Sequence, residues 1–75
     1  MNLLNRISIT SEKRSGQPCI RDLRITVGDV LSYLASGMSV EEIINDFPSL
    51  TKEDILAALQ YASLQINRTS KIQVA

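Results

Sequence analysis

The sequence is poor in the residues that build metal sites, disulfides and most enzyme active sites. Its 75 residues include no histidine, no tryptophan and a single cysteine. One cysteine cannot form a disulfide within the chain, and without histidine it leaves no zinc ligand set. No visible pairing of a nucleophile with a base is present either. We therefore predict a protein that is not an enzyme and that needs no cofactor.

Long apolar runs are also lacking. No stretch approaches the roughly 20 apolar residues that span a membrane, and the first six residues lack the basic start and apolar run of a signal peptide. We expect a cytoplasmic protein that does not contact a membrane. A chain of 75 residues forms a single domain, 1–75, with a small core. Since neither a disulfide nor a metal supports that core, we expect a homodimer or a complex with another protein.

Charge is balanced overall but unevenly placed. Residues 1–25 carry five basic and two acidic side chains, whereas residues 26–60 carry one basic and six acidic side chains. Such asymmetry can mark an interaction face. The first segment offers four basic residues for binding nucleic acid: Lys13, Arg14, Arg21 and Arg24. The same four residues also fit a solvated loop that keeps a small domain soluble.

The pattern over residues 6–25 predicts a β element and a loop. Residues 6–10 alternate polar and apolar, which favours a short strand with Ile7 and Ile9 facing inward. Residues 11–18 are polar and contain Gly16 and Pro18, as loops do. Residues 19–21 and 24–25 are expected to be extended. Cys19 lies near two arginines that could lower the pKa of its thiol, but a lone cysteine in a small domain is more often a buried apolar residue.

Three helices are predicted over residues 26–67. Each begins with a residue pair typical of a capping box: Thr26 with Asp29, Ser39 with Glu42, and Thr51 with Asp54. Gly37 should end the first helix and Pro48 the second. The apolar period of the third helix predicts a buried stripe of Ile55, Leu59, Ala62 and Ile66. Residues 68–75 are predicted to form a flexible tail.

Short connections between three helices predict a mainly α, homeodomain-like tri-helical (helix-turn-helix) bundle with a short N-terminal β element. In such a bundle the third helix would enter the major groove of DNA. Its first turn carries Lys52, Glu53 and Asp54, and two carboxylates oppose contact with phosphates. If the chain binds DNA, the basic N-terminal segment is the better candidate.

An ordered series of short motifs resembles one prokaryotic family. The motifs are Gly16-x-Pro18-Cys19-Ile20-Arg21-x-x-Arg24-Ile25, Gly37-Met38-Ser39-x-Glu41-Glu42-Ile43, Asp46-Phe47-Pro48, and Leu50-Thr51-x-Glu53-Asp54-Ile55-x-Ala57-Ala58-Leu59-x-Tyr61-Ala62. Together they resemble the domain of unknown function 433, and the resemblance covers about residues 5–63. The resemblance implies a homeodomain-like tri-helical fold, frequent dimerisation, and in many members an antitoxin role beside a PIN-type ribonuclease toxin.

The chain departs from the family pattern between Arg21 and Arg24. Members commonly have Gly-Thr there, and this chain has Asp22-Leu23. Glycine permits a left-handed turn that aspartate tolerates less readily and leucine poorly. We therefore expect a different turn, with Leu23 either buried or packed on a partner.

We interpret the sequence as a non-enzymatic, antitoxin-like module that neutralises a neighbouring PIN-type ribonuclease and autoregulates its operon. Leu23 and the tail residues Ile72 and Val74 are the candidate partner contacts. Two alternatives stay open: a dimeric DNA-binding transcriptional regulator that uses the basic segment, and a structural dimer without either partner.

Overall fold

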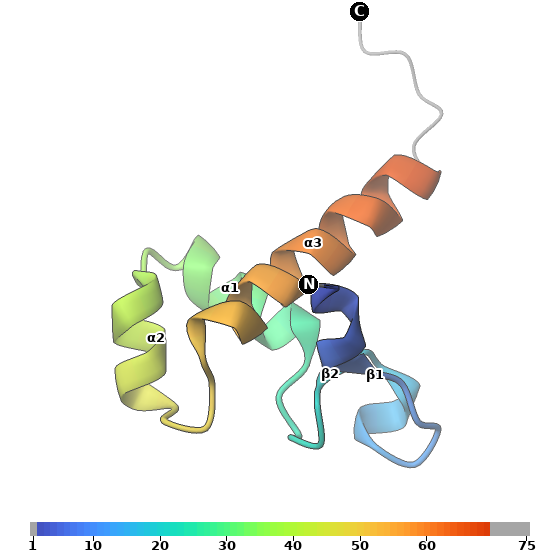
Figure 1. Cartoon of the computed structure of the whole chain (residues 1–75), viewed down its shortest axis with the longest axis horizontal. Coiled ribbons are helices and arrows are strands. Elements are labelled where there is room, and N and C mark those ends of the chain that lie inside the picture. The colour runs from blue at the N-terminus through green and yellow to red at the C-terminus, as the bar shows by residue number, and fades with distance from the viewer. Residues whose placement is uncertain (1, 70–75) are drawn as a thin grey trace, which may run out of the picture.

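Three α-helices follow a two-stranded antiparallel sheet in the computed structural model, which describes residues 2–69 (Figure 1). The helices are α1 (Val27–Ala35), α2 (Val40–Asp46) and α3 (Lys52–Thr69). The strands β1 (Ile7–Ser8) and β2 (Cys19–Ile20) pair Ile7 with Ile20 and Ser8 with Cys19. Two 3-10 helices, η1 (Leu3–Arg6) and η2 (Arg14–Gly16), precede the two strands. The predicted mainly helical class with a short N-terminal β element is confirmed.

Each α-helix begins at the capping box that the sequence predicts. In α1 the backbone N–H of Asp29 donates to the Thr26 hydroxyl at 2.8 Å, and the Asp29 carboxylate accepts from the Thr26 N–H at 3.0 Å. The same reciprocal pair opens the other two helices, between Ser39 and Glu42 and between Thr51 and Asp54. These bonds satisfy backbone donors that a helix start leaves without partners, so sequence-local chemistry sets all three starts.

The connection from α1 to α2 depends on Gly37, whose φ of 102° is open to glycine and strained for other residues. Gly28 provides a matched comparison, because it lies in the first turn of α1 without a positive φ, and a methyl group there meets only the Thr26 hydroxyl at 3.7 Å.

Two alanine substitutions should therefore act in opposite directions. Gly37→Ala should lower the free energy of unfolding by about 1 kcal/mol, because a Cβ strains the left-handed backbone. Gly28→Ala should raise it by up to about 0.5–1 kcal/mol through helix propensity. Urea unfolding followed by circular dichroism measures both values. Equal effects of the two substitutions would contradict the assigned turn.

The core lies between the sheet and the three helices. Its fully buried apolar side chains come from β2, all three helices and the turn before α3: Ile20, Val27, Val30, Ile43, Leu50, Ile55 and Ala58. Ile7, Leu23 and Ile25 pack against its edge. Tyr33 of α1 and Phe47 at the end of α2 stack with ring centroids 4.9 Å apart. The β element is thereby fixed to the helices.

The predicted N-terminal strand is wrong in its length. Arg6 belongs to η1, and β1 ends at Ser8, so Ile9 is 57% exposed instead of facing inward. In the observed register the residue opposite Ile9 is Pro18. Proline has no N–H to donate to a neighbouring strand, so the pairing stops there.

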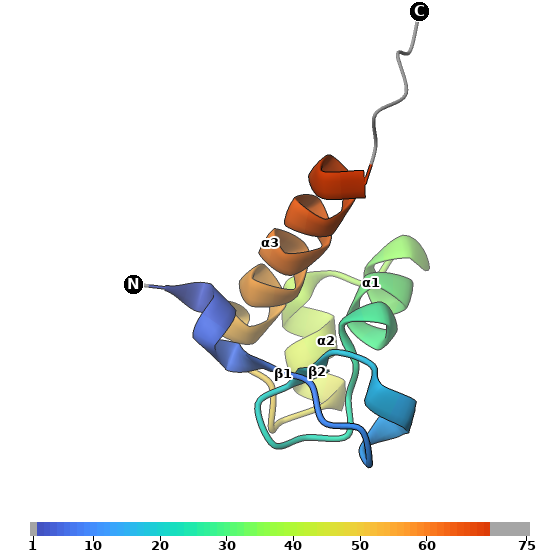
Figure 2. The same cartoon turned by 90° about the vertical axis from the view of Figure 1, so that its right-hand side faces the viewer.

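The predicted buried stripe of α3 is wrong at two of its four residues, Leu59 and Ile66. Ile55 is buried as expected, but Leu59 is 41% and Ile66 is 63% exposed, while Asp54 and Ala58 are fully buried. The helix is turned about its axis because the carboxylate of Asp54 faces inward. In addition, its C-terminal turns extend beyond the other helices (Figures 1 and 2). The helix continues to Thr69, so residues 68 and 69, predicted to start the tail, are helical.

Candidate functional site

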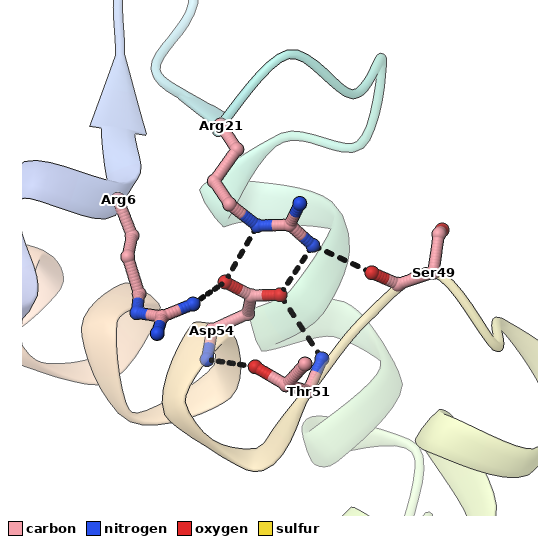
Figure 3. A network of polar contacts seen from close by, with 5 residues as sticks. All are labelled: Arg6, Arg21, Ser49, Thr51 and Asp54. Atoms are coloured by element: carbon pink, nitrogen blue, oxygen red, sulfur yellow. Dashed lines mark hydrogen bonds and ion pairs between the residues drawn. The ribbon is translucent and has the colours of Figure 1, made fainter.

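Asp54, at the start of α3, lies at the centre of a polar network (Figure 3). Its side chain is fully buried and binds two arginines. The Arg21 guanidinium donates from Nε to Oδ1 at 3.0 Å and from Nη2 to Oδ2 at 2.8 Å, which is a two-point contact. Arg6 donates from Nη1 to Oδ1 at 2.9 Å. Planar guanidinium–carboxylate pairs of this kind are among the strongest polar contacts in proteins.

The network joins segments that are far apart in the chain. Thr51 completes the set of donors to Asp54 through its backbone N–H, at 3.0 Å from Oδ2. Arg21 also donates to the backbone carbonyl of Ser49, which lies in the turn before α3. No buried side-chain nitrogen or oxygen of residues 2–69 lacks a hydrogen-bond partner. The Arg6–Asp54–Arg21 network thus fixes η1 and the turn after β2 to the start of α3.

The electrostatics of the network favour the ionised carboxylate. Burial alone would raise the pKa of Asp54, but the hydrogen bonds from Arg21, the Thr51 N–H and Arg6, with the charge of Arg21, lower this pKa to about 2. The hydrogen bond to Asp54 raises the pKa of Arg21 in turn. Asp54 therefore stays charged at neutral pH, which is unsuitable for general acid–base catalysis near pH 7.

The turn that presents Arg21 has its left-handed residue before Asp22-Leu23. The left-handed residue is Arg21 itself, with φ 48°, and neither Asp22 nor Leu23 has a positive φ. The Leu23 N–H donates to the Ile20 carbonyl at 2.8 Å and closes the turn. A left-handed φ costs a non-glycine residue roughly 1–2 kcal/mol, and the contacts of the Arg21 guanidinium offset that cost. The left-handed residue thus precedes Asp22-Leu23, and Leu23 packs against the edge of the core.

Three of the four basic residues proposed for nucleic acid are engaged within the chain. Lys13 donates to the Asp22 carbonyl at 2.9 Å. Arg14 donates to the Arg24 carbonyl at 2.7 Å and to the Asp29 carboxylate at 3.0 Å. Burial opposes ionisation of Asp29, but its bonds to Thr26 and Arg14 lower the pKa of this carboxyl.

The side chain of Arg24, the fourth of these residues, is exposed and makes no hydrogen bond or ion pair within residues 2–69. Arg21, by contrast, binds Asp54. Arg21 and Arg24 therefore do not form one basic surface patch. Leu23 packs against the edge of the core. Ile72 and Val74 lie outside the described residues.

Sequence reasoning missed Arg6 as a member of the network. Its partner is 48 positions away in the chain, and no local pattern joins them. Asp54 was identified only as a helix cap. Asp54 lies two positions after Lys52 and directly before Ile55. These neighbours do not show whether the side chain of Asp54 points into the core or toward solvent.

The one thiol of the sequence belongs to Cys19. Cys19 is 1% exposed and its thiol donates to the Gln17 carbonyl at 3.4 Å, as expected of a small buried residue. Residues 2–69 hold no group of three histidine, cysteine or carboxylate side chains placed to bind a metal ion, and no pocket. None of the helices in this range is both long and apolar enough to cross a membrane.

Carboxylates, by contrast, are exposed on α2. Glu41, Glu42 and Asp46 form what we call the acidic surface of α2. Glu42 closes the capping box of this helix, whereas Glu41 and Asp46 make no hydrogen bond or ion pair with any residue between 2 and 69. These two carboxylates are available to a partner.

Comparison with known proteins agrees with this architecture of three helices and a small sheet. The crystal structure of a DUF433 member protein from Anabaena variabilis superposes with a TM-score of 0.78 at 37% sequence identity. The alignment covers 85% of this chain and 66% of that protein, so this chain spans somewhat less than two thirds of its length. No curated protein matches the sequence.

The class defined by these observations is a small three-helix protein with an N-terminal β element. Residues 7–62 match the family described as protein of unknown function (DUF433). The chain belongs to this family.

Proposed function

We propose that the chain is a non-enzymatic binding module of the antitoxin type, which binds and neutralises a neighbouring PIN-type ribonuclease. The resemblance to a family with many antitoxin members motivates the ribonuclease as partner. The charge distribution is the observation that carries the proposal. Four of the five basic side chains of residues 1–25, Arg6, Lys13, Arg14 and Arg21, bind groups of the chain itself, whereas carboxylates on α2 face solvent. An acidic surface complements the basic surface of a protein that handles nucleic acid.

The same distribution makes direct DNA binding the second choice. Affinity for DNA comes largely from cations placed on phosphates. Arg6, Arg14 and Arg21 already bind carboxylates of the chain. Releasing them to bind phosphate would break the contacts that hold the β element in place. Autoregulation of the operon, a helix-turn-helix role for the bundle and a homodimeric state are further parts of the proposal.

Charge reversal on α2 tests the proposal. Glu41→Lys/Asp46→Lys should weaken binding to the product of the adjacent gene at least about tenfold, because two favourable charge pairs become repulsive. It should also abolish growth rescue on co-expression. The double substitution should change the stability of α2 little. Lysine is unfavourable in the first turn of this helix and favourable in its last turn.

A matched control changes the net charge equally at another site. Glu12→Lys/Asp22→Lys replaces two exposed carboxylates of the N-terminal half and should leave both binding and rescue intact. Absence of a complex at micromolar concentration, with wild-type chain and the adjacent gene product, would disprove the proposal. Equal loss with both double variants would show that only net charge matters and would remove the acidic surface of α2 from it.

A further inference from the structure

The outer face of α3 carries exposed side chains in a heptad pattern. Leu56, Leu59, Ser63 and Ile66 are spaced by three, four and three residues, the a and d spacing of a coiled coil. All four are exposed, Leu56 by 40%, Leu59 by 41% and Ile66 by 63%. We call these four residues the α3 seam. At 100° per residue the seam lies on the side of the helix away from buried Asp54 and Ala58.

The region around the seam is free of charge. From Ile55 to Asn67, thirteen consecutive residues include no aspartate, glutamate, lysine or arginine. Solvent-facing helix surfaces normally carry such residues, and α2 does. The positions that flank a coiled-coil seam, where charged residues often choose a different partner, are here occupied by Gln60, Ala62 and Asn67. The face is thus apolar with neutral flanks.

A neutral apolar face suits a second copy of the same chain. In a twofold dimer the same surface meets itself, so a charge near the axis would approach a like charge. The α3 seam has none. The last turns of α3 extend beyond the other helices (Figures 1 and 2), where another helix can approach.

We propose that two copies of the chain associate through their α3 seams, with the helices antiparallel. In this register Leu56 faces Ile66 of the second copy, and Leu59 faces Ser63 of the second copy. Each large side chain then meets either another apolar side chain or a small one. A parallel pair would instead place Ser63 against Ser63 between the helices. This proposal names the surface of the homodimer proposed above and is tested without the ribonuclease.

The contact is short and its stability should be limited. It involves about three turns of each helix. The area buried should therefore be smaller than the roughly 1,200 Å² at the lower end of stable interfaces. We therefore expect dissociation in the micromolar range. Because no charges take part, the dissociation constant should change less than about twofold between low and physiological salt.

Sedimentation equilibrium of the whole chain tests the proposal with a matched pair of variants. Leu59 and Leu64 are both 41% exposed on the same helix, but Leu64 lies outside the seam. At about 200 µM chain the wild type and Leu64→Lys should be dimers, and Leu59→Lys should be a monomer, with a dissociation constant raised at least about tenfold. Circular dichroism should show that all three are folded.

Three results would overturn the proposal. They are a monomeric wild type at that concentration, a Leu59→Lys variant that still dimerises, and a Leu64→Lys variant that dissociates as fully as Leu59→Lys. Orientation is read from disulfide formation in a mixture of Leu59→Cys and Ser63→Cys chains. The antiparallel pair predicts that the cross-link between the two different chains dominates. A dominant Ser63→Cys homodimer would indicate the parallel pair and disprove the register.

Discussion

Replacing Asp54 by alanine should lower the free energy of unfolding by about 3–4 kcal/mol, the largest effect of any single substitution considered for this chain. The change leaves Arg6 and Arg21 without their carboxylate and removes the acceptor of the Thr51 N–H. A domain of this length has a total stability of about 4–11 kcal/mol at roughly 0.05–0.15 kcal/mol per residue. Urea unfolding monitored by circular dichroism should therefore show a midpoint at a much lower urea concentration than that of the wild type.

Substitutions at nearby residues distinguish the loss of the Arg6–Asp54–Arg21 network from the effect of removing any carboxylate at the start of a helix. Glu53→Ala removes an exposed carboxylate from the same first turn and should cost less than about 1 kcal/mol. Arg21→Met should cost more than Arg6→Met, because Arg21 makes three side-chain hydrogen bonds in the network and Arg6 makes one. If Asp54→Ala unfolded at the same urea concentration as Glu53→Ala, the network would have no structural role.

Acid should unfold the protein through the same residue. The folded pKa of Asp54, about 2, lies below its ordinary value of 3.8, so the unfolded chain takes up this proton first as the pH falls. The ion pair's contribution is complete above about pH 4 and is lost as the pH falls through about 2. A difference of nearly two pKa units corresponds to about 2 kcal/mol. Asp29, whose pKa is also lowered, acts in the same direction.

The measurement is a series of urea unfolding curves between pH 7 and pH 2. The wild type should lose about 2 kcal/mol over the acid part of this range because of Asp54. Asp54→Asn keeps an oxygen for the Thr51 N–H and removes the titrating group, so its stability should be lower at pH 7 and should change less with acid. Parallel curves for the two proteins would show that another group controls the acid transition.

The turn between β2 and α1 shows how a local departure from a family pattern is absorbed. The resemblance led us to expect a different turn at Asp22-Leu23, and neither residue adopts a left-handed backbone. Arg21 adopts it instead, with its guanidinium held by Asp54 and Ser49. A distant side-chain contact thus supports a backbone conformation that glycine would adopt without help.

The sequence alone determined where the helices begin and how α1 and α2 end. Capping boxes, Gly37 and Pro48 act over three or four residues, so their chemistry is complete within a short segment. The composition of the sequence also excludes sites built on histidine, because the sequence contains no histidine.

Only the tertiary structure decided the direction of α3 and the use of the basic residues. Apolar period suggested that Leu59 and Ile66 are buried, but the ion pairs of Asp54 turn that face outward. Arg6 and Arg21 find their carboxylate 48 and 33 positions away. A charged side chain's direction depends on which opposite charge the fold brings within about 4 Å, and the spacing of residues along the chain does not contain that distance.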